Sequence, residues 1–110
     1  MSIFRIALAN LWFPATPAES VAAAEQAIYQ ASAQGAGILC FPECFVPGYR
    51  GMGKAVPPPD AQFLQLAWSA IAAAAARADL AVVLGTERLV EGALRITALV
   101  VNDFWRGNLS

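Results

Sequence analysis

Glu43 is the residue in this sequence whose type and surroundings best suit chemistry. It lies in the run Phe41-Pro42-Glu43-Cys44-Phe45, directly after a short apolar segment. Pro42 has no N–H to donate to a sheet, so it ends a strand and places Glu43 beyond the strand's carboxyl end, where open α/β sheets bind ligands. The apolar neighbours predict a partly desolvated carboxylate, which suits a general base. Local chemistry alone favours the alternative of a surface loop glutamate, or of one that accepts hydrogen bonds from backbone amides.

Several other kinds of chemistry are excluded by composition. The 110 residues contain no histidine, which removes Ser-His-Asp and Cys-His catalysis and histidine metal sites. The seven basic and eight acidic residues leave a net charge of −1, so we expect no nucleic-acid partner. We also expect no cofactor and no metal.

The two cysteines, Cys40 and Cys44, are not expected to form a disulfide. Four residues of extended chain span about 13 Å, whereas the Cα atoms of a disulfide lie within about 7 Å of each other. Two thiols also supply only half of a tetrahedral metal site. Cys40 is interpreted as a small hydrophobic residue inside a strand. Cys44 is either exposed and modifiable or part of a pocket wall, and the second interpretation is favoured.

The elements that must position Glu43 begin with a βαβ unit. Residues 3–10 are rich in branched side chains and predict a strand. Thr16, Pro17 and Glu19 then predict the capped start of a helix that ends near residue 34, before Gly35. Residues 37–41 (GILCF) predict a parallel strand buried on both faces.

The rest of the chain predicts a second helix and two further strands. Residues 42–59 form a long irregular segment with three glycines and five prolines, and such loops are usually functional or mobile. Asp60 is the expected N-cap of a helix over residues 61–78. Strands are predicted over residues 80–85 and 94–101, paired antiparallel across a polar turn at residues 86–92. The predicted order is thus β-α-β-α-β-β in one domain, residues 1–110, in which residues 102–110 have no clear period.

The run FPECFVPGY, with the strand-helix-strand before it and VVLGTERL after it, resembles the N-terminal part of the nitrilase, or carbon–nitrogen hydrolase, superfamily. The resemblance covers about residues 3–101. It implies an α/β fold that is the N-terminal part of a four-layer α-β-β-α sandwich. It also implies hydrolysis of a non-peptide amide, nitrile or carbamoyl bond by a Glu-Lys-Cys set, in which Glu43 is the glutamate. Tyr49, from the family's Gly-Tyr, is then a candidate substrate-binding residue, with simple packing as the equal alternative.

The mechanism that the resemblance implies needs no histidine. A cysteine thiolate attacks the substrate carbon while the carboxylate takes the thiol proton, and a lysine ammonium stabilises the charge of the tetrahedral intermediate. The family's lysine and cysteine lie on later strands, whereas Lys54, Cys40 and Cys44 all come too early to match. We therefore expect an incomplete domain, inactive alone, and hypothesise a fragment or a shifted reading frame that diverges near Asn102.

A second hypothesis is a small self-sufficient flavodoxin-like α/β module that binds a ligand or partner through residues 42–59. A fragment would leave one sheet face without its packing partner and would aggregate or associate, whereas a module would be monomeric. For the hydrolase, we expect a small amide or nitrile substrate and a homo-oligomer. With no secretory leader and no stretch long and apolar enough to span a bilayer, we expect a cytoplasmic protein with no membrane partner.

Overall fold

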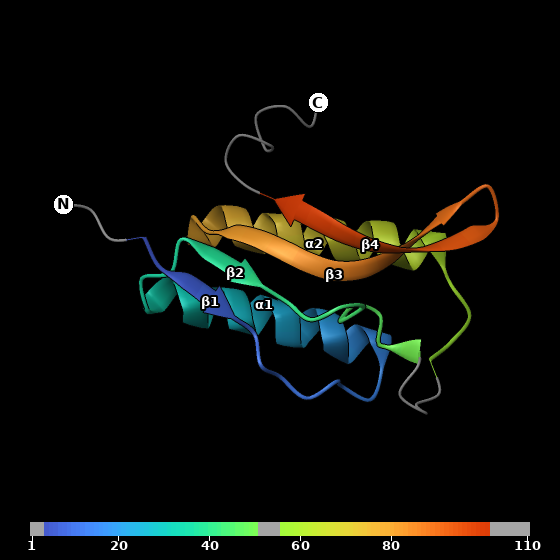
Figure 1. Ribbon diagram of the computed structural model, residues 1–110, viewed down its shortest axis with the longest axis horizontal. Coiled ribbons are helices and arrows are strands. Elements are labelled where there is room, and N and C mark those ends of the chain that lie inside the picture. Colours follow the sequence, from blue (N-terminus) through green and yellow to red (C-terminus); the bar gives the residue numbers. More distant parts are fainter. Residues whose placement is uncertain (1–3, 51–55, 102–110) are drawn as a thin grey trace.

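The computed structural model describes residues 4–50 and 56–101. Its elements follow the predicted order. They are β1 (Ile6–Leu8), α1 (Pro17–Ala33), β2 (Ile38–Cys40), α2 (Ala61–Ala78), β3 (Ala81–Val90) and β4 (Ala93–Val101). The four strands form one sheet in the order β1-β2-β3-β4. The first three strands are parallel and β4 is antiparallel to β3, as expected. Both helices lie behind the sheet in the view of Figure 1.

The two helices begin where their capping residues predict. The Thr16 hydroxyl oxygen accepts a hydrogen bond from the Glu19 amide at 3.1 Å, and the Asp60 carboxylate accepts one from the Phe63 amide at 3.1 Å. The Glu19 carboxylate reaches back to the Ala15 amide at 3.2 Å, one residue before the cap. Gly35 has a φ of 83° after the last turn of α1, which is the left-handed conformation that glycine adopts without steric cost.

The β3–β4 hairpin is longer than predicted. Residues 86–90, expected to be part of a polar turn, belong to β3 and pair with residues 93–97 of β4. Only Glu91 and Gly92 form the turn, with φ values of 51° and 79°. Two consecutive positive φ angles are typical of the tight turn whose twist matches that of two antiparallel strands. The polar side chains did not end the strand because cross-strand pairing satisfies its backbone.

The two N-terminal strands are shorter than predicted, with three residues each in place of 3–10 and 37–41. The expectation that the second strand is buried on both faces is wrong. Leu39 is 2% exposed, whereas its neighbours Ile38 and Cys40 are half-buried. The reason is that, in the described residues, helices cover one face of this sheet and leave the other uncovered.

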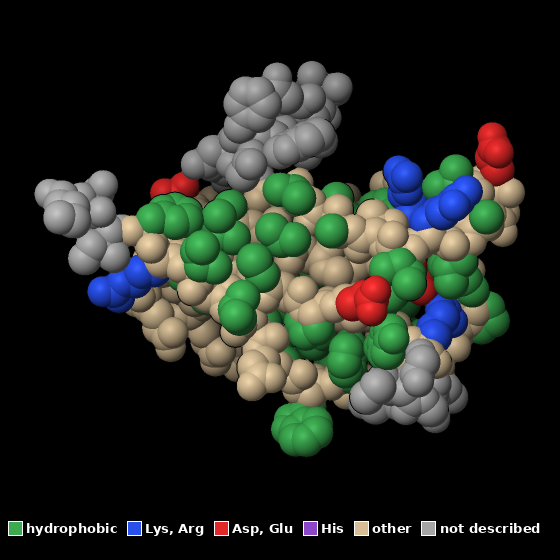
Figure 2. Space-filling view, viewed as in Figure 1, with side chains coloured by type: hydrophobic (Ala, Val, Ile, Leu, Met, Phe, Trp, Pro, Cys, Tyr) green, Lys and Arg blue, Asp and Glu red, His purple; other side chains and the backbone are tan. Residues whose placement is uncertain are grey.

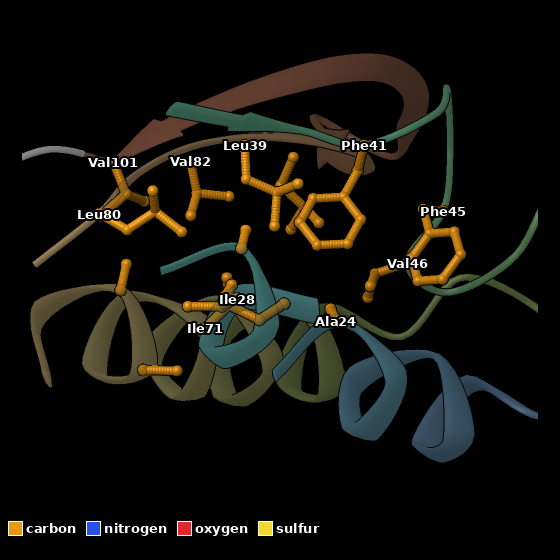
Figure 3. Close-up of a cluster of buried hydrophobic side chains, with 14 of the residues drawn as sticks. Ala24, Ile28, Leu39, Phe41, Phe45, Val46, Ile71, Leu80, Val82 and Val101 are labelled. Carbon is orange, nitrogen blue, oxygen red and sulfur yellow. The ribbon is translucent and has the colours of Figure 1, made fainter. Parts of the chain in front are cut away.

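The hydrophobic core lies between that covered face and the two helices. Side chains from the strands, such as Leu39, Val82 and Val101, point toward Ile28 of α1 and Ile71 of α2 (Figure 3). On α1, Ala24, Ile28 and Ala31 are buried and Val21 is half-buried, at the spacing of one helix face. On α2, Leu64, Ala67, Ile71 and Ala74 are buried, and Phe63 is half-buried.

The opposite face of the sheet, which we call the open face, carries apolar side chains that no described element covers. On β1, Ile6 is 63% and Leu8 is 76% exposed, and on β4, Ile96 is 66% and Val100 is 43% exposed. Hydrophobic side chains accordingly gather over the strands on the side shown in Figure 2. Sheets with parallel strands are normally covered on both faces. A single sheet with helices on one side corresponds to two of the four layers that the resemblance implies.

Candidate active site

Glu43 lies in the turn that follows β2, at the carboxyl end of the parallel strands, where the sequence places it. The next residue, Cys44, has a φ of 54°, a left-handed conformation that is uncommon for residues other than glycine and that often occurs near functional sites. The predicted partial desolvation of Glu43 is wrong. Its side chain is exposed, because the apolar neighbours Phe41, Cys44 and Phe45 turn into the core and leave the carboxylate outside.

Three consecutive residues of β3 hold the segment that carries Glu43. The Gly85 carbonyl accepts a hydrogen bond from the Val46 amide at 3.2 Å, and the Thr86 carbonyl lies 3.8 Å from the Cys44 sulfur. The third residue, Glu87, binds Arg50. The segment is therefore attached to the neighbouring strand at Cys44, Val46 and Arg50, all on the C-terminal side of Glu43.

Arg50 and Glu87 form a paired contact of two hydrogen bonds. Arg50 Nε donates to Glu87 Oε2 at 2.9 Å, and Nη2 donates to Oε1 at 2.5 Å. The same guanidinium donates through Nη1 to the carbonyls of Val56 and Pro57, at 3.3 and 2.8 Å. The hydrogen bonds that Arg50 donates to Glu87 raise the pKa of the Arg50 guanidinium. Glu87 is 1% exposed and binds Arg50, whereas the next residue, Arg88, is exposed.

Four aromatic rings lie beneath the turn. The ring of Phe45 contacts those of Phe41 and Phe13, with centroids 5.3 and 5.8 Å apart. Tyr49 stacks on Phe13 at 6.1 Å and is half-buried. The loop after β1 and the loop after β2 thus meet beyond the carboxyl ends of these two strands.

The two cysteines occupy different environments. Cys44 is 5% exposed, so the alternative of an exposed, modifiable thiol is wrong. Burial, followed by the negative charges of Glu43 and Glu87, raises the pKa of the Cys44 thiol. Cys40 was expected to be an interior hydrophobic residue, but it is half-buried because it lies on the open face. Both thiols are free. Among residues 4–50 and 56–101, no three His, Cys, Asp or Glu side chains gather into a metal site.

Other sequence candidates lie away from Glu43 or outside the described residues. Lys54 and residues 102–110 fall among the latter. A groove of about 490 Å³ lies between α2 and the β3–β4 hairpin, where Trp68 Nε1 donates to the Thr86 hydroxyl at 3.0 Å. Glu43 does not line this groove. We therefore do not assign the groove as the reaction site, despite its volume. No helix in the described part of the chain is long and apolar enough to cross a membrane.

Sequence reasoning missed Gly85 and the Arg50–Glu87 pair. A methyl group at Gly85 would overlap the Pro42 carbonyl, so the backbone of the turn can approach β3 only at a glycine. A lone glycine inside a strand pattern is a known signal of such an approach. The ion pair joins residues 37 positions apart, and no local pattern indicates it.

The sequence matches a known family, and the fold resembles solved structures. The sequence model of the family described as carbon–nitrogen hydrolase matches residues 5–104. A mutant of the Nesterenkonia AN1 amidase from the nitrilase superfamily is 27% identical, with a TM-score of 0.71; the match covers 90% of this chain and 38% of the amidase. Another structure of the amidase from Nesterenkonia sp. AN1 shows Michael addition of acrylamide at its active site cysteine.

The glutamine-dependent NAD+ synthetase from Acinetobacter baumannii shares the fold at 24% identity, with a TM-score of 0.75; the match covers 91% of this chain and 19% of the synthetase. The chain therefore spans well under half the length of these solved structures. No curated protein sequence matches it.

Proposed function

This chain belongs to the carbon–nitrogen hydrolase family, and from that premise we propose that it contributes the general base, Glu43, to the hydrolysis of a non-peptide carbon–nitrogen bond. The observation that carries the proposal is the position of Glu43. Its carboxylate is exposed at the carboxyl end of β2, on a turn that hydrogen bonds fasten to β3. An exposed carboxylate on a rigid backbone is accessible to both a thiol and a substrate.

The proposed reaction has two halves. In the first, Glu43 accepts the proton of a cysteine thiol, and the thiolate attacks the substrate carbon. The carbon–nitrogen bond of an amide then breaks, and the nitrogen leaves as ammonia or an amine with the proton that Glu43 held. In the second half, Glu43 takes a proton from water, and the hydroxide attacks the thioester carbon. The carbon–sulfur bond then breaks, the acid is released, and Glu43 returns the proton to the cysteine sulfur.

The nucleophile and the cation are proposed to come from outside these 110 residues. Cys44 is buried, and its raised pKa disfavours the thiolate, so it is a poor nucleophile. Cys40 lies within β2, before the turn that carries Glu43. We therefore propose that the chain by itself is inactive and that a lysine and a cysteine on later strands complete the set.

The substrate class proposed is a small amide, with a nitrile or carbamoyl compound as the wider range. The amidase likeness and the glutamine-dependent synthetase likeness both favour an amide. Tyr49, half-buried beside Phe13 at the same end of the sheet, is the proposed substrate contact. The flavodoxin-like module is not favoured, since the family match covers residues 5–104.

We propose that a second sheet, or a second copy of the chain, covers the open face in the working protein and that the protein is a homo-oligomer. The support is the row of exposed apolar side chains on β1 and β4, which water would otherwise contact.

The experiment that tests the function compares Glu43→Gln with the native residue in a longer protein that contains this chain, by ammonia release from simple amides. We expect turnover to fall by about 10²- to 10⁴-fold, the usual contribution of a general base, with an unchanged Tm because Glu43 is exposed. Glu25→Gln on α1 is the control and should keep full turnover. Retained turnover in Glu43→Gln would remove Glu43 from the mechanism. Ammonia release by the 110-residue chain alone would overturn the proposed inactivity and direct attention to Cys44.

A further inference from the structure

We propose that Arg50 and Glu87 are positioning residues for Glu43: their ion pair keeps the turn after β2 docked on β3, so that the carboxylate stays at one place. The proposal rests on the proposed role of Glu43 as the base. It adds two residues that touch neither substrate nor reacting atoms but determine where the base lies.

The first argument is that Arg50 is committed to the protein. A guanidinium has five N–H groups. Four of those of Arg50 have protein acceptors, two on Glu87 and one each on the carbonyls of Val56 and Pro57. Its side chain is 28% exposed, so it is partly reachable from solvent, yet little of its bonding capacity is left for a substrate carboxylate. Arg50 thus connects its own segment of the loop to Val56 and Pro57 and to Glu87 of β3.

The second argument is that Glu87 is buried for this contact. Its side chain is 2% exposed, and it lies on the same side of β3 as Gly85, the open face, where Ile96 of β4 is its cross-strand partner. A buried carboxylate is costly unless it is paired and hydrogen-bonded. The Glu87 carboxylate keeps its partner only while the loop that carries Arg50 stays docked on β3. Undocking of the loop would therefore leave the buried charge of Glu87 unpaired.

The third argument is the route from the pair to Glu43. The turn is attached to β3 at successive residues, with Val46 on Gly85, Cys44 on Thr86 and Arg50 on Glu87. Of these three attachments, the first is one backbone hydrogen bond and the second is a weak thiol contact at 3.8 Å. The ion pair is the only one of the three with charged partners, and hydrogen bonds between charged groups are the strong ones. Its loss should therefore release the turn.

The test measures amide hydrogen exchange by NMR. Exchange at the Val46 amide reports the docking of the turn on Gly85, and exchange at the Ile28 and Ile71 amides reports the stability of the core. In Arg50→Met we expect exchange at Val46 to accelerate at least tenfold more than at the two core amides. Arg50→Lys keeps the charge but cannot form the paired contact and should give an intermediate acceleration. Glu43→Gln is the matched control and should leave all three amides as in the wild type.

Because a buried unpaired Glu87 could unfold Arg50→Met, the double variant Arg50→Met/Glu87→Met provides the second measurement. Apolar replacement of both partners often preserves stability, so core exchange should return to the wild-type rate while Val46 stays fast. Wild-type protection at Val46 in this double variant, or acceleration at Val46 only in step with the core, overturns the proposal. These readouts do not depend on turnover, so a failure of Glu43 as the base is seen separately, in the ammonia assay.

Discussion

Gly85 of β3 lies so close to Pro42 that a Cβ atom in its place would overlap the Pro42 carbonyl oxygen and would lie 2.8 Å from the Cα atom of Glu43. The turn that presents the candidate base is thus built directly against the backbone of the neighbouring strand. The position of Glu43 depends on the absence of a side chain more than 40 residues later in the chain.

Gly85→Ala should both destabilise the protein and displace the turn. The added methyl group meets backbone atoms, which cannot rotate away as a flexible side chain can, so we expect a loss of about 1–3 kcal/mol in the free energy of unfolding. Urea unfolding measures the loss, and the amide shifts of Cys44 and Val46 report the displacement. Ala98→Val is the control, since Ala98 is the exposed cross-strand partner of Gly85 and has room for a larger group. Equal effects of the two substitutions would contradict the close approach.

The raised pKa of Cys44 predicts a stability that falls at high pH. Burial, followed by the charges of Glu43 and Glu87, raises the pKa of this thiol above the ordinary 9.0. In the window between the two pKa values the folded protein keeps the proton and the unfolded chain loses it. The free energy of unfolding therefore decreases as the pH rises above about 9 and is unaffected by this thiol at lower pH.

Urea unfolding between about pH 7.5 and pH 10 measures this dependence. Other groups titrate in the same range, so the comparison is between variants. Cys44→Ala should lose the part of the decrease that Cys44 causes, and Cys40→Ala, which removes the other free thiol, should retain it. Identical pH profiles for the wild type and Cys44→Ala would show that the Cys44 thiol has no such effect.

The open face predicts that the 110-residue chain associates through β1 and β4. Ile96→Lys places a charge among the exposed apolar side chains of β4 and should shift sedimentation toward the monomer. Leu66→Lys is a matched control, because Leu66 on α2 is also 66% exposed but lies on the helical side of the protein. A wild-type chain that sediments as a monomer and melts cooperatively would argue for a self-contained module.

Substitutions of Tyr49 separate substrate contact from packing. Tyr49→Phe preserves the ring that stacks on Phe13, so the Tm should not change. If the hydroxyl contacts substrate, KM of a longer active protein should rise roughly three- to tenfold, as for the loss of one neutral hydrogen bond. Tyr49→Leu should in addition lower the free energy of unfolding by about 0.5–1.5 kcal/mol, because the aromatic contact is lost. An unchanged KM in Tyr49→Phe would leave Tyr49 with a packing role alone.

The parts of the fold that could be predicted are those that neighbouring residues decide. Thr16 and Asp60 bind amides three residues away. Gly35 adopts a positive φ because it has no side chain. Helix bounds were therefore predicted to within a residue. The β3–β4 turn was predicted too long. Thr86 and Glu87 are polar, which locally favours a turn, but pairing in the sheet makes them buried residues of β3.

For the site, the sequence by itself determined that Glu43 follows a strand and that Pro42 ends it, because the chemistry of proline acts on adjacent residues. The tertiary structure alone decided what surrounds that glutamate: its exposed carboxylate, the glycine against which its turn lies, and the Arg50–Glu87 pair that holds the loop. These contacts join residues about 40 positions apart. They arise because β2 pairs in parallel with the first residues of β3, so the turn that follows β2 lies against the next residues of β3. The local sequence pattern of neither segment contains information about this long-range contact.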